Sequence, residues 1–169
     1  MAYRGRASEL RVEHKIIIIK IDKESRGELV QIIERNRAKS FSVKIDLGGV
    51  FWAMEALLEA WRKISETTFF SKYRRSSAVF CLQRFDNRRG VFVELSKWMA
   101  GTKMSNIIIL VEVNGQGWIE MAGLLGKIIH GDNKEKSLLI RTIRMLINDR
   151  EFKQKGGAMK VPWWRGSVI

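Results

Sequence analysis

Residues 79–98 read VFCLQRFDNRRGVFVELSKW, and residues 16–35 read IIIIKIDKESRGELVQIIER. In each stretch an apolar strand pattern leads into a polar turn that ends in Arg-Gly, and a second strand pattern follows. The two stretches lie 63 residues apart, and the class of residue agrees along their length. Self-similarity at a fixed spacing is the signature of a duplicated structural unit. We therefore predict two copies of one unit, each built around a β-hairpin.

The segment after each hairpin repeats as well. Residues 41–63 match residues 107–129 at an offset of 66, so we expect an insertion of three residues near positions 100–102. From residue 39 to 46 apolar and polar residues alternate, which is typical of a strand with one buried face. From residue 51 to 64 the period changes to that of an amphipathic helix. This offset pairs Gly49 with Gly115, Trp52 with Trp118, Ala56 with Ala122, and Leu58 with Leu124.

One more strand is predicted at the start of each unit, over residues 8–14 and 67–74. Each unit then has four strands and a helix, and chains of about 60 residues are only marginally stable alone. We therefore expect an α+β fold in which two tandem ββββα repeats, about 8–64 and about 67–130, clasp each other into one domain. In this domain helices back the antiparallel sheets. A basic amphipathic helix and a tail are predicted within the C-terminal segment, residues 131–169.

The charge of the chain indicates the class of partner. There are 31 Lys and Arg residues against 18 Asp and Glu, a net charge of +13, and the pI is near 10.2. Such a surplus on a folded chain favours polyanions, nucleic acid first and an acidic membrane surface second. No apolar run reaches the roughly 18 residues of a spanning helix, so integral membrane association is not expected. The N-terminal sequence also lacks the apolar core of a signal peptide.

The sequence contains no motif that indicates catalysis. The two histidines, His14 and His130, are not close to a cysteine or carboxylate motif, and no phosphate-binding glycine loop or hydrolase motif occurs. The single cysteine, Cys81, excludes an internal disulfide framework. We therefore expect a binding protein and not an enzyme, with no catalytic residues, no metal site and no cofactor.

The second hairpin resembles a known family. Its residues Asn87-Arg88-Arg89-Gly90-Val91-Phe92-Val93-Glu94-Leu95 are similar to the signature of the PUR-repeat (Pur-alpha-like) single-stranded nucleic-acid binders, Asn-x-Arg-Gly followed by basic-Phe-hydrophobic-basic-hydrophobic. The sequence departs from this signature at Val91 and Glu94, where the family usually has Arg or Lys. The first hairpin keeps only Arg26-Gly27 and two aliphatic residues. The Whirly proteins share a similar plan of strands and helix and are a near alternative.

The resemblance implies one PUR-like domain over residues 8–130, with single-stranded DNA or RNA lying on the sheet faces that the helices leave uncovered. Strand alternation sends three rings of the second repeat to that face, where unpaired bases can stack on them. An apolar outward face is also typical of a dimer interface or of a surface that the C-terminal segment covers, and these interpretations stay open. The candidate nucleic-acid-binding residues are Lys20, Arg26, Lys44, Arg84, Phe85, Asn87, Arg88, Arg89, Phe92 and Trp98.

The main hypothesis is thus a basic protein that binds single-stranded DNA or RNA without catalysis, with a role in transcription regulation implied by the family. The alternative is a homodimerising protein-interaction module whose basic charge is incidental, and a peripheral membrane-surface protein is a third, more remote reading. The family implies nucleus or cytoplasm, and the Whirly-like plan an organelle. The choice between DNA and RNA, the preferred base sequence and the role of the C-terminal segment stay open.

Overall fold

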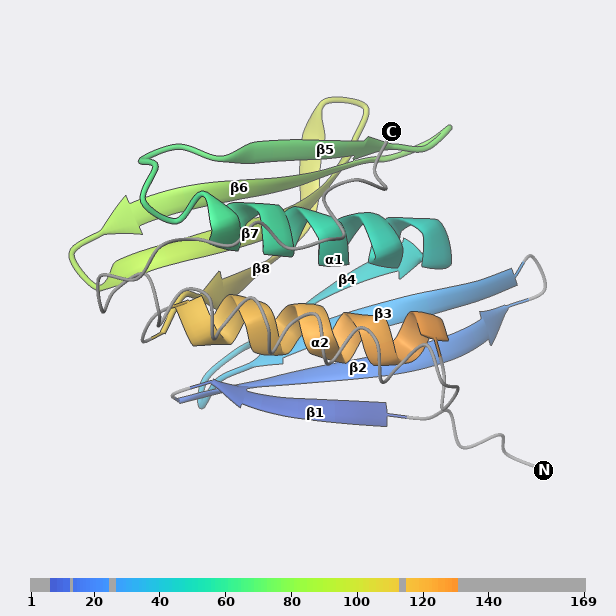
Figure 1. Ribbon diagram of the computed structural model, residues 1–169. Helices are drawn as coiled ribbons and strands as arrows, with labels where there is room; N and C mark the ends of the chain where they lie inside the picture. Colours follow the sequence, from blue (N-terminus) through green and yellow to red (C-terminus); the bar gives the residue numbers. More distant parts are fainter. Residues whose placement is uncertain (1–6, 13, 25–26, 113–114, 131–169) are drawn as a thin grey trace. The chain divides into compact units, whose positions relative to one another are not determined.

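The computed structural model describes residues 7–12, 14–24, 27–112 and 115–130. It confirms an α+β fold made of two ββββα units, each with a four-stranded antiparallel sheet whose strands follow chain order (Figure 1). The predicted C-terminal helix lies outside the described residues. The first unit comprises β1 (Ala7–Val12), β2 (Lys15–Glu24), β3 (Gly27–Arg35), β4 (Ser40–Asp46) and α1 (Leu47–Arg62). The second comprises β5 (Phe70–Arg74), β6 (Val79–Asn87), β7 (Gly90–Met99), β8 (Thr102–Leu110) and α2 (Gln116–His130).

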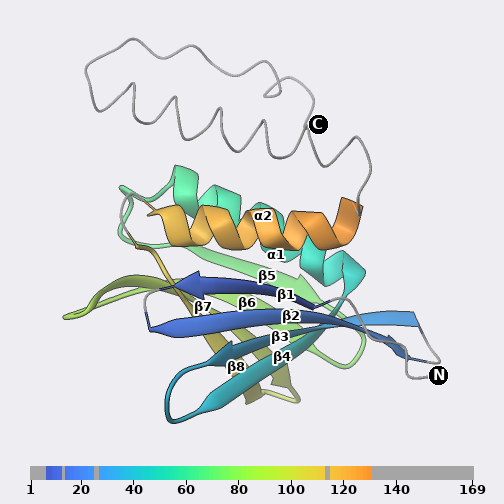
Figure 2. The same ribbon diagram turned by 90° about the horizontal axis from the view of Figure 1, so that it is seen from below.

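The two helices lie side by side on one face of the sheets (Figures 1 and 2). α1 contacts β3 and β4 of its own unit and β5 and β6 of the other, while α2 contacts β8 and β1. Each helix therefore covers parts of both sheets, and neither unit buries its apolar face without the other. The buried strand residues are Ile17, Ile19, Val30, Ile32, Val43 and Ile45 in the first sheet, and Phe80, Leu82, Val93, Leu95, Ile107 and Ile109 in the second.

We call the helix-covered side of each sheet its inner face. The opposite sides are outer face I, formed by β1–β4, and outer face II, formed by β5–β8. Residues alternate between the two sides along every strand, because successive side chains of a strand point in opposite directions. Ile17 and Ile19 illustrate the inner face of the first sheet, since both are fully buried.

The offset between the units grows along the chain, and the insertion of three residues predicted near residues 100–102 is too large, because only one extra residue lies in the β7–β8 hairpin. Val43 pairs with Ile32 and Ile107 with Leu95, so the offset in the last strand is 64. In the helices it is 68, because the buried positions of α1 recur in α2 at that spacing. Most of the extra residues therefore lie between β8 and α2. The matching buried residues are Val50, Ala53, Met54 and Leu57 in α1, and Trp118, Met121, Ala122 and Leu125 in α2.

The predicted pairing of Trp52 with Trp118 is therefore also wrong. Trp118 is fully buried, and its indole N–H donates to the carbonyl of Ile109 over 3.1 Å. Trp52 is only half-buried and reaches the other unit, where its indole N–H donates to Ser71 Oγ over 2.9 Å and its ring stacks on Tyr73. Two tryptophans at similar places in the sequence thus have different neighbours.

The start of α1 is tied to the second unit. The Asp46 carboxylate accepts a hydrogen bond from the Gly49 amide over 2.8 Å, which caps the helix. It also accepts from the Tyr73 hydroxyl over 3.1 Å and forms an ion pair with Arg75. Burial and the neighbouring Asp46 charge raise the pKa of Tyr73. A Cβ at Gly48 would lie 2.8 Å from the Tyr73 hydroxyl oxygen, so this close approach favours glycine.

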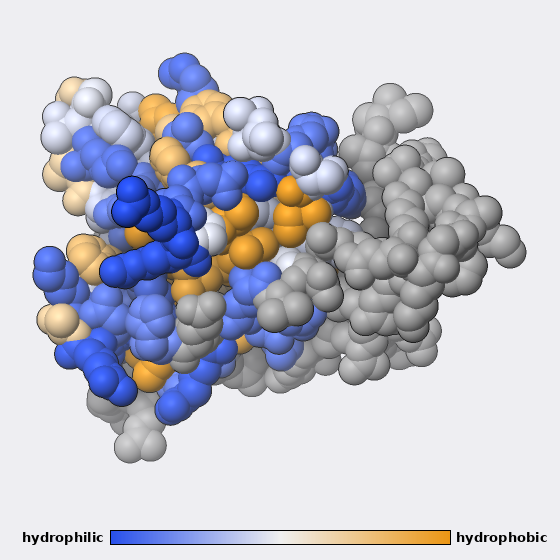
Figure 3. Space-filling model, turned by 90° about the vertical axis from the view of Figure 1, so that its left-hand side faces the viewer, coloured by the Kyte–Doolittle hydropathy of each residue, from blue (hydrophilic) through white to orange (hydrophobic). Residues whose placement is uncertain are grey.

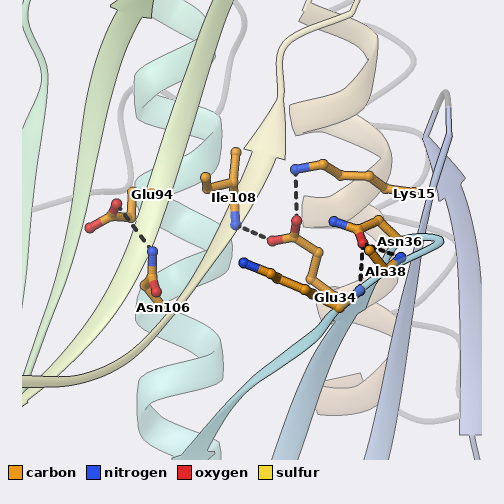
Figure 4. A network of polar contacts seen from close by, with 8 residues as sticks. Lys15, Glu34, Asn36, Ala38, Glu94, Asn106 and Ile108 are labelled. Carbon is orange, nitrogen blue, oxygen red and sulfur yellow. Dashed lines mark hydrogen bonds and ion pairs between the residues drawn. The ribbon is translucent and has the colours of Figure 1, made fainter.

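A buried carboxylate links the two sheets (Figure 4). Glu34 on β3 is 3% exposed and accepts a hydrogen bond from the backbone N–H of Ile108 over 2.6 Å. Because β8 is an edge strand, this N–H has no partner in its own sheet. The Lys15 ammonium lies 2.7 Å from the other oxygen of Glu34. The link therefore gives the buried Glu34 carboxylate a cationic partner and gives the Ile108 N–H at the edge of β8 a hydrogen-bond acceptor.

Candidate functional site

Outer face II combines rings with cations. Phe85 on β6 and Phe92 on β7 lie directly opposite each other, and their rings stack with centroids 5.6 Å apart. Phe85 is 37% exposed, and Phe70, on the neighbouring strand β5, is 56% exposed. Figure 3 views the molecule from the end that carries the β6–β7 turn and shows hydrophobic side chains open to the surface among hydrophilic ones. Phe70 begins β5 and Phe85 lies two residues before the end of β6, so both belong to the same end of the sheet.

Trp98 lies further along β7 and is half-buried on the same face. Its indole N–H donates to Ser96 Oγ over 2.9 Å, and the Lys103 ammonium lies 5.4 Å from the centre of its ring. Lys103 also contacts the Glu94 carboxylate at 2.6 Å. The ring is thus held in place by the hydroxyl and carries a cation on one side.

Two further cations lie on the β5 edge of outer face II. Lys72 is paired with Cys81 and Arg74 with Val79, so both side chains point to this face. Burial raises the pKa of the Cys81 thiol, while the charges of Lys72, Arg74 and Lys103 act to lower it. Sheet register places Arg74 and Lys103 in the same row across the sheet, and Lys72 lies two residues from Arg74 on β5. Neither Lys72 nor Arg74 has an ion-pair partner among the residues that the structure describes.

The sequence interpretation missed Lys72, Arg74 and Lys103 as site residues. Alternation along residues 70–74 was a usable signal for the first two, because it separates Lys72 and Arg74 from Ser71 and Tyr73, which contact α1 or its cap. For Lys103 the signal was weaker. A register shift between β7 and β8 at Lys97/Trp98 brings Lys103 opposite Trp98, and no local sequence pattern predicts such a shift.

The predicted residues at the β6–β7 turn are exposed. Asn87 and Gly90 are the last paired residues of the hairpin, and Arg88 and Arg89 form the turn between them. The side-chain oxygen of Asn87 accepts a hydrogen bond from the Arg89 amide over 2.8 Å. Gly90 has a φ of 125°, a conformation that residues with a Cβ rarely adopt. Asn87 and Gly90 therefore shape the turn, and the two arginine side chains extend from it.

Arg84 differs from the predicted role. Its guanidinium is 8% exposed and donates to the backbone carbonyls of Ile64, over 2.6 Å, and Glu66. Arg84 alternates with Gln83 and Phe85 and so lies on the inner face, where it holds the end of α1 and the following loop against β6. It is not available to a phosphate group, and we leave it out of the candidate site.

The predicted residues of the first unit lie on outer face I or outside the described residues. Lys20 and Lys44 are exposed on strands β2 and β4, on either side of Gln31. Lys44 lies 4.0 Å from the Asp22 carboxylate. Arg26 is outside the described residues. Two of the three predicted cations of this unit therefore share a face, and Lys44 has an acidic neighbour there.

Within residues 7–12, 14–24, 27–112 and 115–130 there is no group of three or more His, Cys, Asp or Glu side chains placed to hold a metal ion. Neither helix of this part of the chain is long and apolar enough to cross a membrane.

The chain is similar to a known protein over most of its length. It is 27% identical over 121 residues, 70% of its length, to the transcription factor Pur-alpha 1 of Arabidopsis thaliana, and it spans 40% of that protein. No family model matches the chain. Together with the two ββββα units, this similarity points to the PUR-repeat family, and no finer assignment follows from it.

Proposed function

We propose that the protein binds single-stranded DNA or RNA through outer face II, without catalysis. The observation that carries this proposal is the placement of Lys72, Arg74 and Lys103 beside rings that the helices do not cover. The exposed arginines of the β6–β7 turn, Arg88 and Arg89, extend the basic surface beyond the sheet.

The chemistry of this face suits an unpaired strand better than a duplex. Base faces in a duplex are stacked on each other, whereas an unpaired base can stack on a protein ring with a gain of about 1–3 kcal/mol. Phe70, Phe85, Phe92 and Trp98 offer such rings. Lys and Arg side chains at the edge of the rings attract phosphates and displace the cations condensed on them. Any base can stack on a ring, so stacking alone does not select a base sequence.

The similar Arabidopsis protein supports the proposal through the role that its name states. It is a transcription factor, so we extend a role in transcription, carried out by binding and not by catalysis, to this chain. The compartments that fit this role are the nucleus and the cytoplasm.

Fluorescence anisotropy with a labelled oligonucleotide tests the proposal. We expect the single strand to bind about tenfold more tightly than its duplex, because stacking is lost in the duplex. Three phosphate contacts predict a slope of about −2 for log affinity against log salt, hence a loss of roughly fifteenfold between about 50 mM and 200 mM salt. Equal binding of single strand and duplex, or binding that salt leaves unchanged, contradicts the proposal.

A second function is favoured by the apolar end of the same face. Phe70 and Phe85 are exposed on β5 and β6, and Ile108 and Leu110 lie half-buried on β8, across β7 on the same face. An apolar patch of this kind also fits a second copy of the chain. Light scattering separates the two functions, since a tight dimer that does not bind oligonucleotide supports the homodimerising module instead.

A further inference from the structure

Glu94 lies in the middle of outer face II. It is on β7, which has a neighbouring strand on each side, and it is directly paired with Gln83 of β6 and Ile108 of β8. Along β7 it is flanked by Phe92 and Ser96, and the nearest residues on the same side of a strand are about 7 Å apart. A base stacked on Phe92 would therefore present its edge to the Glu94 side chain.

The carboxylate of Glu94 is oriented by two neighbours. One oxygen contacts the Lys103 ammonium at 2.6 Å, and the other accepts from the Asn106 side-chain amide over 3.3 Å, as Figure 4 shows for the second contact. The side chain is 15% exposed, so it is held and still open to the surface. A carboxylate offers about four acceptor positions and no donor. Two contacts leave acceptor positions available to a ligand.

The negative charge of Glu94 determines which part of a nucleic-acid strand can approach it. Phosphate oxygens are repelled, and they are attracted instead to the cations at the edge of the face, Lys72 and Arg74. The base edges are then the parts of the strand that reach Glu94. Adenine, cytosine and guanine carry an exocyclic amino group, which can donate to a carboxylate, as in the pairing of acidic side chains with cytosine N4. Thymine and uracil carry carbonyl oxygens instead.

We propose that Glu94 is a specificity-determining residue, which favours bases with an exocyclic amino group over thymine and uracil. The inference rests on the proposed binding of single strands to outer face II. Glu94 accepts a hydrogen bond from the amino group of a base stacked beside it, while Lys103 and Asn106 fix the orientation of the carboxylate. A carbonyl oxygen in the same place faces a negative charge and loses this contact.

The test compares oligonucleotides of deoxycytidine and deoxythymidine, which have rings of the same size. We expect wild-type protein to bind the cytosine oligomer about fivefold more tightly or better. In Glu94→Gln this preference should fall to about one, because the amide can also donate to a carbonyl oxygen. Glu55→Gln is the matched control, because it changes the same charge at an exposed position of α1 and should keep the wild-type preference.

A third oligomer makes the test independent of any variant. It replaces cytosine by a pyrimidin-2-one that lacks the amino group, and wild-type protein should bind it as weakly as the thymine oligomer. If wild-type protein binds all three oligomers equally, or if Glu94→Gln keeps the preference, the role of Glu94 is wrong and strand binding stands. If wild-type protein binds none of them, the proposed function itself fails.

Discussion

The two outer faces occupy equivalent places in two similar units, yet their side chains differ. Sheet register matches each residue of β1–β3 with the residue 63 positions later in β5–β7. Where outer face II has a ring, outer face I has a small, acidic, aliphatic or basic residue. The matched positions are Phe70 and Ala7, Phe85 and Asp22, Phe92 and Leu29, and Trp98 and Arg35.

The distribution of charge differs as well. On outer face I acids lie next to bases, as in the contact of Arg11 with Glu9 at 3.1 Å and of Lys44 with Asp22 at 4.0 Å. The position of Glu9 is occupied on outer face II by Lys72. On outer face II, Lys72 and Arg74 lie at the β5 edge and Lys103 lies on β8 beside Trp98. The inner faces of both sheets carry mostly buried apolar residues that pack against the helices, whereas the outer faces differ in their residue types.

The largest effect is expected at the link between the sheets. Glu34→Ala should lower the free energy of unfolding by roughly 3–5 kcal/mol, because Lys15 and the Ile108 N–H lose a buried partner. The matched position in the second unit is Lys97, whose ammonium lies over the Phe80 ring. Lys97→Ala should cost less than about 1 kcal/mol. Urea unfolding of both variants measures the difference, and equal losses would show that the two positions are equivalent after all.

The next largest effect concerns the cations of the two outer faces. The double variant Lys72→Ala with Arg74→Ala should weaken binding of a single strand about tenfold at low salt and make the salt slope shallower by about 1 to 1.5. Lys20→Ala with Lys44→Ala removes the same charge from outer face I and should weaken binding less than about threefold. Salt titrations of both proteins test this contrast. A larger loss from outer face I would reverse the assignment of the site.

The smallest effect is expected from an exchange of matched apolar residues. Phe92→Leu places the residue of the first unit on outer face II and should weaken binding of a single strand about fivefold, with little change in the salt slope, because a ring and not a charge is lost. Leu29→Phe makes the reverse change on outer face I and should leave affinity within about twofold. A steeper or shallower salt slope in Phe92→Leu would indicate a disturbed cation and not a lost stacking surface.

Much of the fold follows from local pattern. The two hairpins, the alternation of buried and outward residues and the helix after each sheet are confirmed, since each depends on neighbours within a few residues. The register of β8 and of the helices does not depend on such neighbours. An apolar period of two or 3.6 fits several offsets equally well. An offset of 66 residues therefore matches the apolar pattern, although the offset in the structure is 64 in the last strand and 68 in the helices.

In the candidate site, too, some features follow from local sequence and others depend on distant contacts. The outward direction of Phe85 and Phe92 was visible in the alternation of their strands, and so was the exposed turn at Arg88 and Arg89. The burial of Arg84 was not visible, because its partners are carbonyls about 20 residues earlier in the chain.

Periodicity and duplication within the chain thus establish two ββββα units and the buried side of each strand, because both are properties of adjacent residues. Contacts between distant residues select the rest: the helix register, the Glu34 link and the grouping of Lys72, Arg74 and Lys103 around the rings. Such contacts form only when the two units pack together, and no pattern within one segment encodes which side chain of the other segment will face it.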